Sequence, residues 1–146
     1  MKKRILLFIA LLLLTSFLLP MLVGCENMVK GKEARATFDS FFAAVVREDY
    51  EAARAYLHPC NSALDLEQIF VEVRAEYGID LRYGTSEAPR QVGFQASIYN
   101  TEFMGSGYTM TFHAQTAASG TPIVISCTVV RNAEGYGIYS FLINRR

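Results

Sequence analysis

The sequence predicts an α+β domain in which helices come first and an antiparallel sheet follows. Before Gly78, apolar residues recur every three or four positions, which is typical of helices with one buried face. After Gly78, apolar and polar residues alternate, which is typical of strands with one buried face. Short segments rich in Gly, Ser and Asn separate the alternating stretches, as turns between neighbouring strands do. We therefore expect three helices followed by a four-stranded antiparallel meander.

The first two helices are predicted over Glu33 to Arg47 and Tyr50 to Leu57. The first carries a one-sided apolar stripe. Asp49 precedes the second helix, where an Asp side chain caps free backbone N–H groups. Pro59 prevents that helix from continuing, because proline lacks a backbone N–H. The stripe consists of Phe38, Phe41, Phe42, Val45 and Val46.

A third helix is predicted to begin after Asp65 and to end at Gly78. Asp65 and Gln68 have the spacing of a capping box. Glycine often ends a helix because it adopts the left-handed conformation without a steric penalty. Residues Ile79 to Tyr83 add a candidate edge strand.

Four strands with short turns account for the rest of the chain. One face of the second strand, Tyr108 to Gln115, is polar, so we expect that face to meet solvent. The other strands are predicted over residues 91–98, 123–131 and 136–144, with turns at 105–107, 118–120 and 132–135.

The N-terminus has the three-part build of a secretory signal. Lys2, Lys3 and Arg4 precede an apolar run from Ile5 to Leu19. Residues 22–25, Leu-Val-Gly-Cys, resemble the bacterial lipobox at all four positions. The resemblance implies cleavage after Gly24 and attachment of a diacylglyceryl group to the thiol of Cys25. The two acyl chains of that group are enough for a stable membrane anchor.

An uncleaved membrane anchor is the alternative, because residues 5–24 are just long enough to span a bilayer. In both cases the positive residues stay inside, so the domain is expected outside the cytoplasm. We expect a cell-membrane lipoprotein on the extracytoplasmic face.

The sequence therefore divides into a signal peptide (1–24), a short tether (25–32) and one domain (33–146). The 122 residues after Gly24 suffice for one domain with a core. Without Lys2, Lys3 and Arg4, the 14 basic residues fall to 11 against 14 acidic ones, a net charge of −3. An acidic domain without a basic run argues against nucleic acid as a partner.

Two cysteines remain once Cys25 is assigned to the lipid. Cys60 and Cys127 could pair in an oxidising compartment, or both could be buried thiols. Cys127 shares a strand face with Ile125 and Val129, as a core cysteine would. Two distant cysteines without His or Cys at ligand spacing do not predict a metal site. We expect no cofactor.

The domain resembles the nuclear transport factor 2-like (cystatin-like) domains of exported bacterial lipoproteins. The likeness rests on residues 41–53, on Tyr56-Leu57-His58-Pro59, and on the closing strand that follows Gly135. The resemblance implies a curved sheet that wraps the first helix and leaves a conical pocket. Members of this superfamily use such a pocket for isomerase or dehydratase chemistry, for binding, or for docking proteins.

No catalytic motif is visible. Enzymes of that fold place an Asp or His base inside the cone with an acidic or Tyr donor opposite. The ionisable candidates here each have an ordinary structural explanation or no partner that the sequence can name: His113 falls on a polar strand face, and His58 precedes a proline at a helix end, where a cap or surface role is common. The candidates are Asp39, His58, Tyr99, Glu102 and His113.

The aromatic side chains are the better functional clue. Rings with few polar neighbours suit an apolar ligand, although the same rings can simply fill a core that lacks Trp. We expect a non-enzymatic module that binds an apolar small molecule or an envelope protein. The alternative is a small enzyme of the isomerase or dehydratase type. The candidate pocket residues are Phe42, Tyr56, Tyr99, Tyr108, Phe112 and Tyr139.

Overall fold

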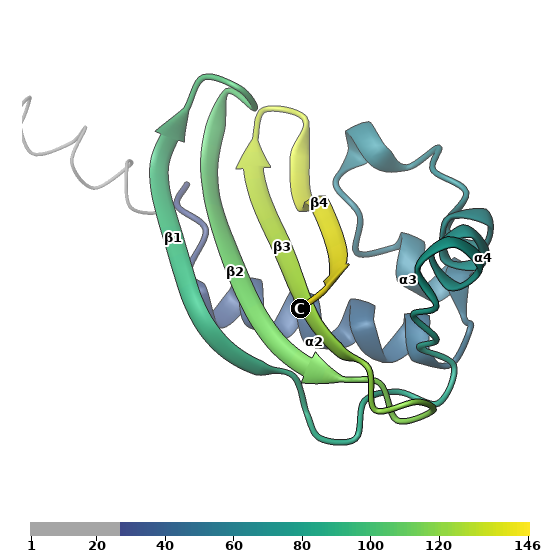
Figure 1. The fold of residues 1–146 in the computed structure, drawn as a ribbon. Coiled ribbons are helices and arrows are strands. Elements are labelled where there is room, and N and C mark those ends of the chain that lie inside the picture. Colours follow the sequence, from purple (N-terminus) through teal and green to yellow (C-terminus); the bar gives the residue numbers. More distant parts are fainter. Residues whose placement is uncertain (1–26) are drawn as a thin grey trace, which may run out of the picture.

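The computed structural model describes residues 27–146, and Figure 1 shows its helices against one curved sheet. The signal peptide and Cys25 lie outside the described residues. The helices are α2 (Gly31–Val46), α3 (Tyr50–Arg54), the 3₁₀ turn η1 (Pro59–Asn61) and α4 (Leu66–Tyr77). The strands are β1 (Arg90–Asn100), β2 (Gly105–Gln115), β3 (Pro122–Asn132) and β4 (Gly135–Arg145).

The sheet is an antiparallel meander, with the strand order β1-β2-β3-β4. Met110 of β2 pairs with Cys127 of β3, which in turn pairs with Phe141 of β4. These three side chains share the face that α2 covers, which we call the inner face. The opposite, outer face carries Thr109 and Thr128, whose hydroxyls lie 2.9 Å apart. The predicted α+β class and antiparallel order are confirmed.

Local capping signals predicted the helix ends well. The side chain of Asp49 accepts a hydrogen bond from the N–H of Ala52, and that of Asp65 accepts one from the N–H of Gln68. Gly78 ends α4 with a φ of 64°. The Gln68 side chain donates to Glu72 rather than completing the capping box.

Several expected boundaries were wrong. Residues 105–107, expected as a turn, belong to β2 and pair with β1 or β3, and the turn lies at 101–104. The second helix ends at Arg54, not at Leu57, because Tyr56 and Leu57 leave the helix to bond with β4. Ile79 to Tyr83 form no strand; Ile79 is buried in the core, and the chain turns where Gly84 N–H donates to Leu81 C=O. The predicted tether belongs partly to the domain, since α2 begins at Gly31 and Val29 is buried.

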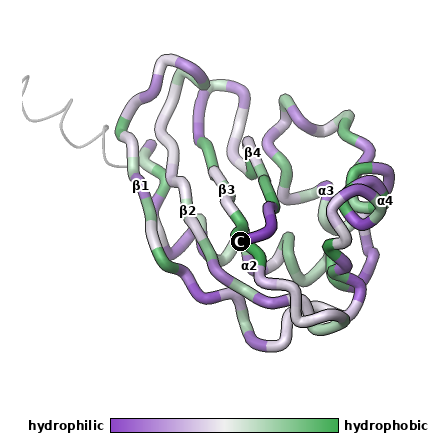
Figure 2. Tube along the Cα trace, viewed as in Figure 1, coloured by the Kyte–Doolittle hydropathy of each residue, from purple (hydrophilic) through white to green (hydrophobic). Residues whose placement is uncertain are grey.

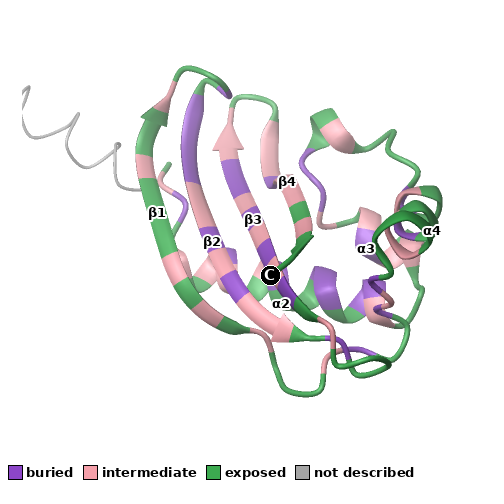
Figure 3. Ribbon diagram, in the orientation of Figure 1, coloured by how far each residue is buried: buried purple, intermediate pink, exposed green. Residues whose placement is uncertain are grey.

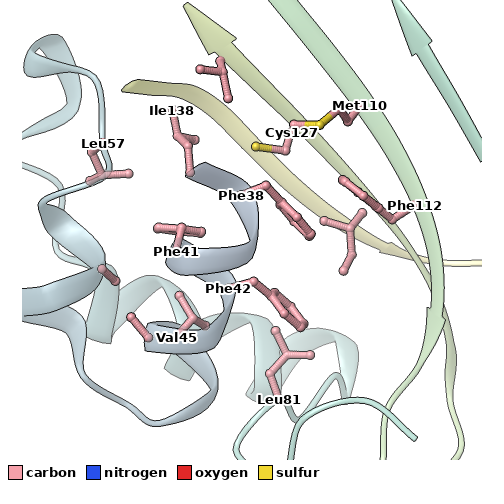
Figure 4. Close-up of a cluster of buried hydrophobic side chains, with 14 of the residues drawn as sticks. Phe38, Phe41, Phe42, Val45, Leu57, Leu81, Met110, Phe112, Cys127 and Ile138 are labelled. Atoms are coloured by element: carbon pink, nitrogen blue, oxygen red, sulfur yellow. The ribbon is translucent and has the colours of Figure 1, made fainter. Parts of the chain in front are cut away.

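The core lies between α2 and the inner face of the sheet. The ring of Phe38 stacks on Phe112 of β2 with centroids 4.0 Å apart and an interplanar angle of 10°. Phe41 meets Phe141 of β4 edge to face at 5.0 Å. Figure 4 shows Phe38 pointing toward Phe112, whereas Phe41 lies on the side of the helix toward Leu57. The predicted stripe of the first helix is therefore the side that faces the sheet.

A polar contact next to this core ties α2 to the last two strands. Arg131 of β3 pairs with Glu33 of α2 and lies over the ring of Tyr136. The hydroxyl of Tyr136 is 2.8 Å from that of Thr37, one helical turn after Glu33. Burial raises the pKa of the Tyr136 phenol, so it stays a neutral hydrogen-bonding group at physiological pH.

Strand β1 extends beyond the helix layer and is largely exposed (Figure 3). Its register with β2 shifts between Gln91 and Gly93 and again between Ser97 and Asn100. Phe94 is 67% exposed and Ile98 is 72% exposed, although both belong to the apolar series of this strand. In Figure 2 the strands show short alternating apolar and polar segments, so burial here depends on the cover and not on the pattern.

Phe38→Ala is expected to lower the free energy of unfolding by about 3–5 kcal/mol, because it leaves a cavity against Phe112. Phe94→Ala is the matched control: the same truncation at an exposed ring should cost less than about 1 kcal/mol. Denaturant unfolding of both variants measures the difference. Equal losses would contradict this description of the core.

Candidate functional site

The six aromatic residues predicted to line a pocket do not share one cavity. Phe42 and Phe112 are buried in the core, and Tyr56 and Tyr108 pack against it half-buried. Tyr99 is exposed, with its hydroxyl donating to the sulfur of Met104. Of the six, Tyr139 lies in surface hollows. The structure therefore does not bring these six rings together as one pocket, and Phe42 and Phe112 pack in the core between α2 and the sheet.

The ionisable candidates also remain apart. Asp39 is exposed on α2 and paired with Arg35, whose Nε lies 2.9 Å from the carboxylate. His113 is half-buried rather than solvent-facing, and its Nδ1 is buried without a hydrogen-bond partner. Glu102 and Tyr99 are exposed at the β1–β2 turn. No pair of these four forms an acid–base site.

A polar hollow of about 210 Å³ lies on the outer face of the sheet. Its floor carries small polar side chains from all four strands. Phe103, from the β1–β2 turn, and Tyr139 of β4 form its aromatic end, with ring centroids 5.5 Å apart. The polar lining consists of Gln95, Ser97, Asn100, Glu102, Thr109, Thr128 and Ser140.

His58 is the exception among the candidates, because it is fully buried and not at the surface. The chain after α3 runs alongside β4: the N–H of His58 donates to the C=O of Ile138, and the N–H of Ile138 donates to the C=O of Tyr56. Gly137 allows this close approach, since a Cβ there would lie 2.5 Å from the backbone nitrogen of His58. The glycine of the closing strand thus determines where the imidazole lies.

Both nitrogens of the imidazole have hydrogen-bond partners, and these partners determine which nitrogen carries the proton. The Oδ1 atom of Asn132 accepts from the N–H groups of Glu134 and Gly135, at 2.9 and 3.2 Å. The same oxygen lies 3.0 Å from His58 Nε2, so Nε2 must be the donor. His58 Nδ1 accepts from the N–H of Cys60 at 3.3 Å, which agrees with a neutral ring protonated at Nε2.

The Sγ atom of Cys60 lies 3.1 Å from His58 Nδ1. Because Nδ1 carries a lone pair in this tautomer, the thiol is the donor of that contact. Asn132 is held in turn by its Nδ2, which donates to the C=O of Phe103 at 2.8 Å. A thiol, a base and a group that orients the base are therefore hydrogen-bonded one after another in space. This is the general arrangement of an activated cysteine nucleophile.

Cys60 opens into a second hollow, of about 280 Å³, which we call the thiol hollow. Its aromatic wall, Phe103 and Tyr139, is shared with the outer-face hollow. The remaining lining residues are Glu102, Met104, Asn132, Ala133 and Glu134.

The two cysteines are both free, so the disulfide that the sequence left open is not formed. Cys60 is exposed, whereas Cys127 is fully buried on the inner face of the sheet. Burial raises the pKa of the Cys127 thiol to about 12, so this thiol stays protonated and inert. The two thiols have opposite environments.

Within residues 27–146, no group of three His, Cys, Asp or Glu side chains is arranged to hold a metal ion. The helices in that range are also too short or too polar to cross a bilayer. Family models, curated proteins and solved structures were compared with the chain, and none matches it. The geometry of the site is therefore the basis for interpreting it.

Sequence reasoning considered His58 and Cys60 separately and missed Asn132. The two-residue spacing of His58 and Cys60 before a short turn was an available signal. Asn132 lies 74 positions beyond His58. An Asn at the start of a turn is commonly explained by hydrogen bonds within that turn, and Asn132 Oδ1 does accept such a bond from the N–H of Glu134.

Gly137→Ala should separate residues 56–58 from β4, because the new methyl group overlaps the backbone of Leu57 and His58. We expect a loss of about 2–4 kcal/mol of unfolding free energy. Gly93→Ala is the control, since a Cβ there meets nothing within 4 Å. The NMR signal of the His58 Nε2 proton should broaden or disappear in the first variant and persist in the second. An unchanged signal in Gly137→Ala would contradict this role of the glycine.

Proposed function

We propose that this protein is a lipid-anchored lipoprotein on the extracytoplasmic face of the cell membrane, and that its domain is a non-enzymatic docking module. The anchor is the diacylglyceryl group on Cys25 that the lipobox-like residues 22–25 imply. The surface that docks is the apolar edge, which we define as Phe94 and Ile98 of β1. The observation that carries this proposal is that the apolar edge lies beside the first described residues of the chain.

The filled interior favours a surface function. The stacking of Phe38 on Phe112 occupies the space in which a conical pocket would lie. Cys127 and Met110, which line the same layer, are both 0% exposed. An apolar ligand therefore has no room between α2 and the sheet, and the exposed apolar residues are the remaining candidates for binding.

The start of the described chain is bonded to the sheet close to the β1–β2 turn. The hydroxyl of Ser106 donates to the C=O of Asn27 at 2.7 Å and accepts from the N–H of Val29 at 3.1 Å. Cys25 is only two residues before Asn27, and two residues span at most about 7 Å. A lipid on Cys25 would therefore hold this end of the domain at the bilayer.

The apolar edge runs from the middle of β1 toward the same end of the sheet. Phe94 stacks on Tyr108 with centroids 5.4 Å apart, and Tyr108 in turn lies against Gly31 at the start of α2. Ile98 lies between Ser97 and Asn100, whose partners Gly107 and Gly105 flank Ser106. Both side chains are thus neighbours of the segment that leads to the anchor, so we commit to the bilayer surface as their partner.

Two charges support this orientation. Lys30 and Lys32 are exposed at the start of α2, on either side of Gly31, which lies against Tyr108. Basic side chains next to apolar ones are the usual composition of a surface that lies on anionic headgroups. The acidic character of the rest of the domain disfavours contact through its other faces.

A nuclear transport factor 2-like assignment is the finer form of the fold proposal. A long first helix against a curved four-stranded sheet supports it (Figure 1). Under this assignment, aromatic side chains fill the cone, and the domain binds its partner through its outer surface and not through a pocket. The isomerase or dehydratase alternative would need two ionisable groups in the cone, and the candidates lie elsewhere.

The experiment uses the absence of Trp in this chain, so that one introduced Trp is a single-site probe. Phe94→Trp and the control Leu142→Trp replace exposed apolar residues on opposite faces, the latter 59% exposed. Each full-length variant is produced in bacteria and reconstituted into vesicles that contain brominated lipids. Phe94→Trp should be quenched and blue-shifted, whereas Leu142→Trp should behave as in water.

Intact mass of the same preparations tests the anchor separately. A chain that begins at Cys25 with the added diacylglyceryl mass supports lipidation, and a chain that begins at Met1 with an unmodified Cys25 contradicts it. With the anchor established, quenching of both probes or of neither would overturn the proposed orientation.

A further inference from the structure

We propose that Cys60 is a reactive thiol that forms a mixed disulfide with small cationic disulfides bound in the thiol hollow. His58 accepts the proton of the thiol, and Asn132 holds the imidazole in the required tautomer. This proposal does not depend on the lipid anchor or on the docking surface.

The first argument is that the hydrogen bonds of His58 orient its Nδ1 atom as an acceptor toward the Cys60 thiol. It is fully buried, yet each ring nitrogen has a defined partner. The donor role of Nε2 follows from the two backbone N–H groups that already donate to Asn132 Oδ1. Nδ1 is therefore left as an acceptor 3.1 Å from Sγ, from which it can take the thiol proton.

The second argument is access. Cys60 is exposed and borders the thiol hollow, so a second sulfur can approach it. Phe103, Met104 and Tyr139 offer aromatic and thioether surface to the carbon chain of a ligand. Glu102 and Glu134 border the same hollow and give it negative charge. A cationic disulfide is thus favoured over an anionic one.

The reaction is thiol–disulfide exchange. The Sγ proton moves to His58 Nδ1, and the thiolate attacks one sulfur of R–S–S–R. The S–S bond of the reagent breaks as the Cys60–S–S–R bond forms. The leaving thiolate takes the proton back from Nδ1 and departs as R–SH. Cys60 is oxidised and one half of the reagent is reduced, so no other oxidant is needed.

The mixed disulfide should persist because the described residues provide no second thiol to resolve it. Cys127 is buried on the inner face with its thiol protonated. An acyl transfer would also require donors for an oxyanion, whereas disulfide exchange develops no such charge. Exchange is therefore the reaction that the described groups can complete.

The test measures adduct formation on the full-length protein in detergent at pH 7, with cystamine as the cationic disulfide. Intact mass gives the rate, and proteolytic peptides locate the adduct. The reference is a synthetic peptide of residues 56–64, which contains His58 and Cys60 without the fold. We expect the folded protein to react at least about tenfold faster than the peptide. A rate equal to or below that of the peptide would overturn the proposal.

Two variants assign the roles of Cys60 and His58. Cys60→Ser should abolish the adduct at this site. His58→Gln should lower the rate about tenfold, while an unchanged rate in a folded variant would exclude His58 as the base. Should His58→Gln fail to fold, the comparison with the peptide still decides.

Asn132 is a positioning residue, and its test needs a readout of the tautomer. Asn132→Asp keeps an acceptor for Nε2 but loses the Nδ2 donor to the C=O of Phe103. It should retain the ¹⁵N signature of a ring protonated at Nε2 and a higher rate than Asn132→Ala. Asn132→Ala should lose both the signature and the rate. Loss of rate in Asn132→Ala with the tautomer unchanged would contradict the positioning role.

A separate comparison tests whether the thiol hollow prefers a cationic disulfide. We define the charge ratio as the rate of adduct formation with cystamine divided by the rate with anionic oxidised glutathione. This ratio should be higher for the wild-type protein than for the peptide. The double variant Glu102→Gln, Glu134→Gln should bring that ratio back to the peptide value. A ratio unaffected by the two substitutions would exclude a role for these carboxylates.

Discussion

The contact between Phe38 and Phe112 is the interaction on which the rest of the structure depends. It joins the middle of α2 to the middle of β2 through two rings stacked 4.0 Å apart. The strands on either side then curve around the helix, as Figure 1 shows. The rings occupy the concave side of the sheet, and the two hollows described above lie on its outer face and beside the β1–β2 turn.

The surfaces that carry those hollows are organised by the start of β4 and by the β1–β2 turn. Gly137 lets the segment after α3 bond to β4, which carries His58 to the turn that contains Asn132. Phe103 packs over Gly107 and contributes a wall to the thiol hollow. Met104 is exposed at the same turn, close to the apolar edge of β1. The outer-face hollow and the thiol hollow meet at this turn through the wall that Phe103 and Tyr139 share.

The parts predicted from the sequence are those set by local physical chemistry. Asp49, Asp65 and Gly78 form hydrogen bonds with backbone groups only a few residues away. Their positions in the sequence therefore predict the helix ends. The alternation in Tyr108 to Gln115 likewise predicted a strand with one polar face. The stripe on the first helix predicted its buried side because the same residues would otherwise be exposed to water.

The failures have a common cause in contacts between distant segments. Tyr56 and Leu57 follow a helix directly, but the hydrogen bonds of Tyr56 C=O and His58 N–H with Ile138 of β4 end that helix early. The alternation of apolar and polar residues in β1 predicts a strand with one covered face, yet within residues 27–146 Phe94 is 67% exposed. Asn132 joins His58 across 74 positions, a pairing that no local pattern encodes. The reactive site was invisible for this reason.

The central claim is that the interior between α2 and the sheet is filled, so that function lies at the surface. The most direct test is a methyl-resolved NMR titration of the protein with benzene, which enters apolar cavities of sufficient size. The methyl groups of Met110 and Ile125 are fully buried in this layer. The account predicts that they keep their chemical shifts and show no NOE to benzene. Saturable shifts with NOEs to these two methyl groups would contradict it, because they would reveal an internal binding cavity.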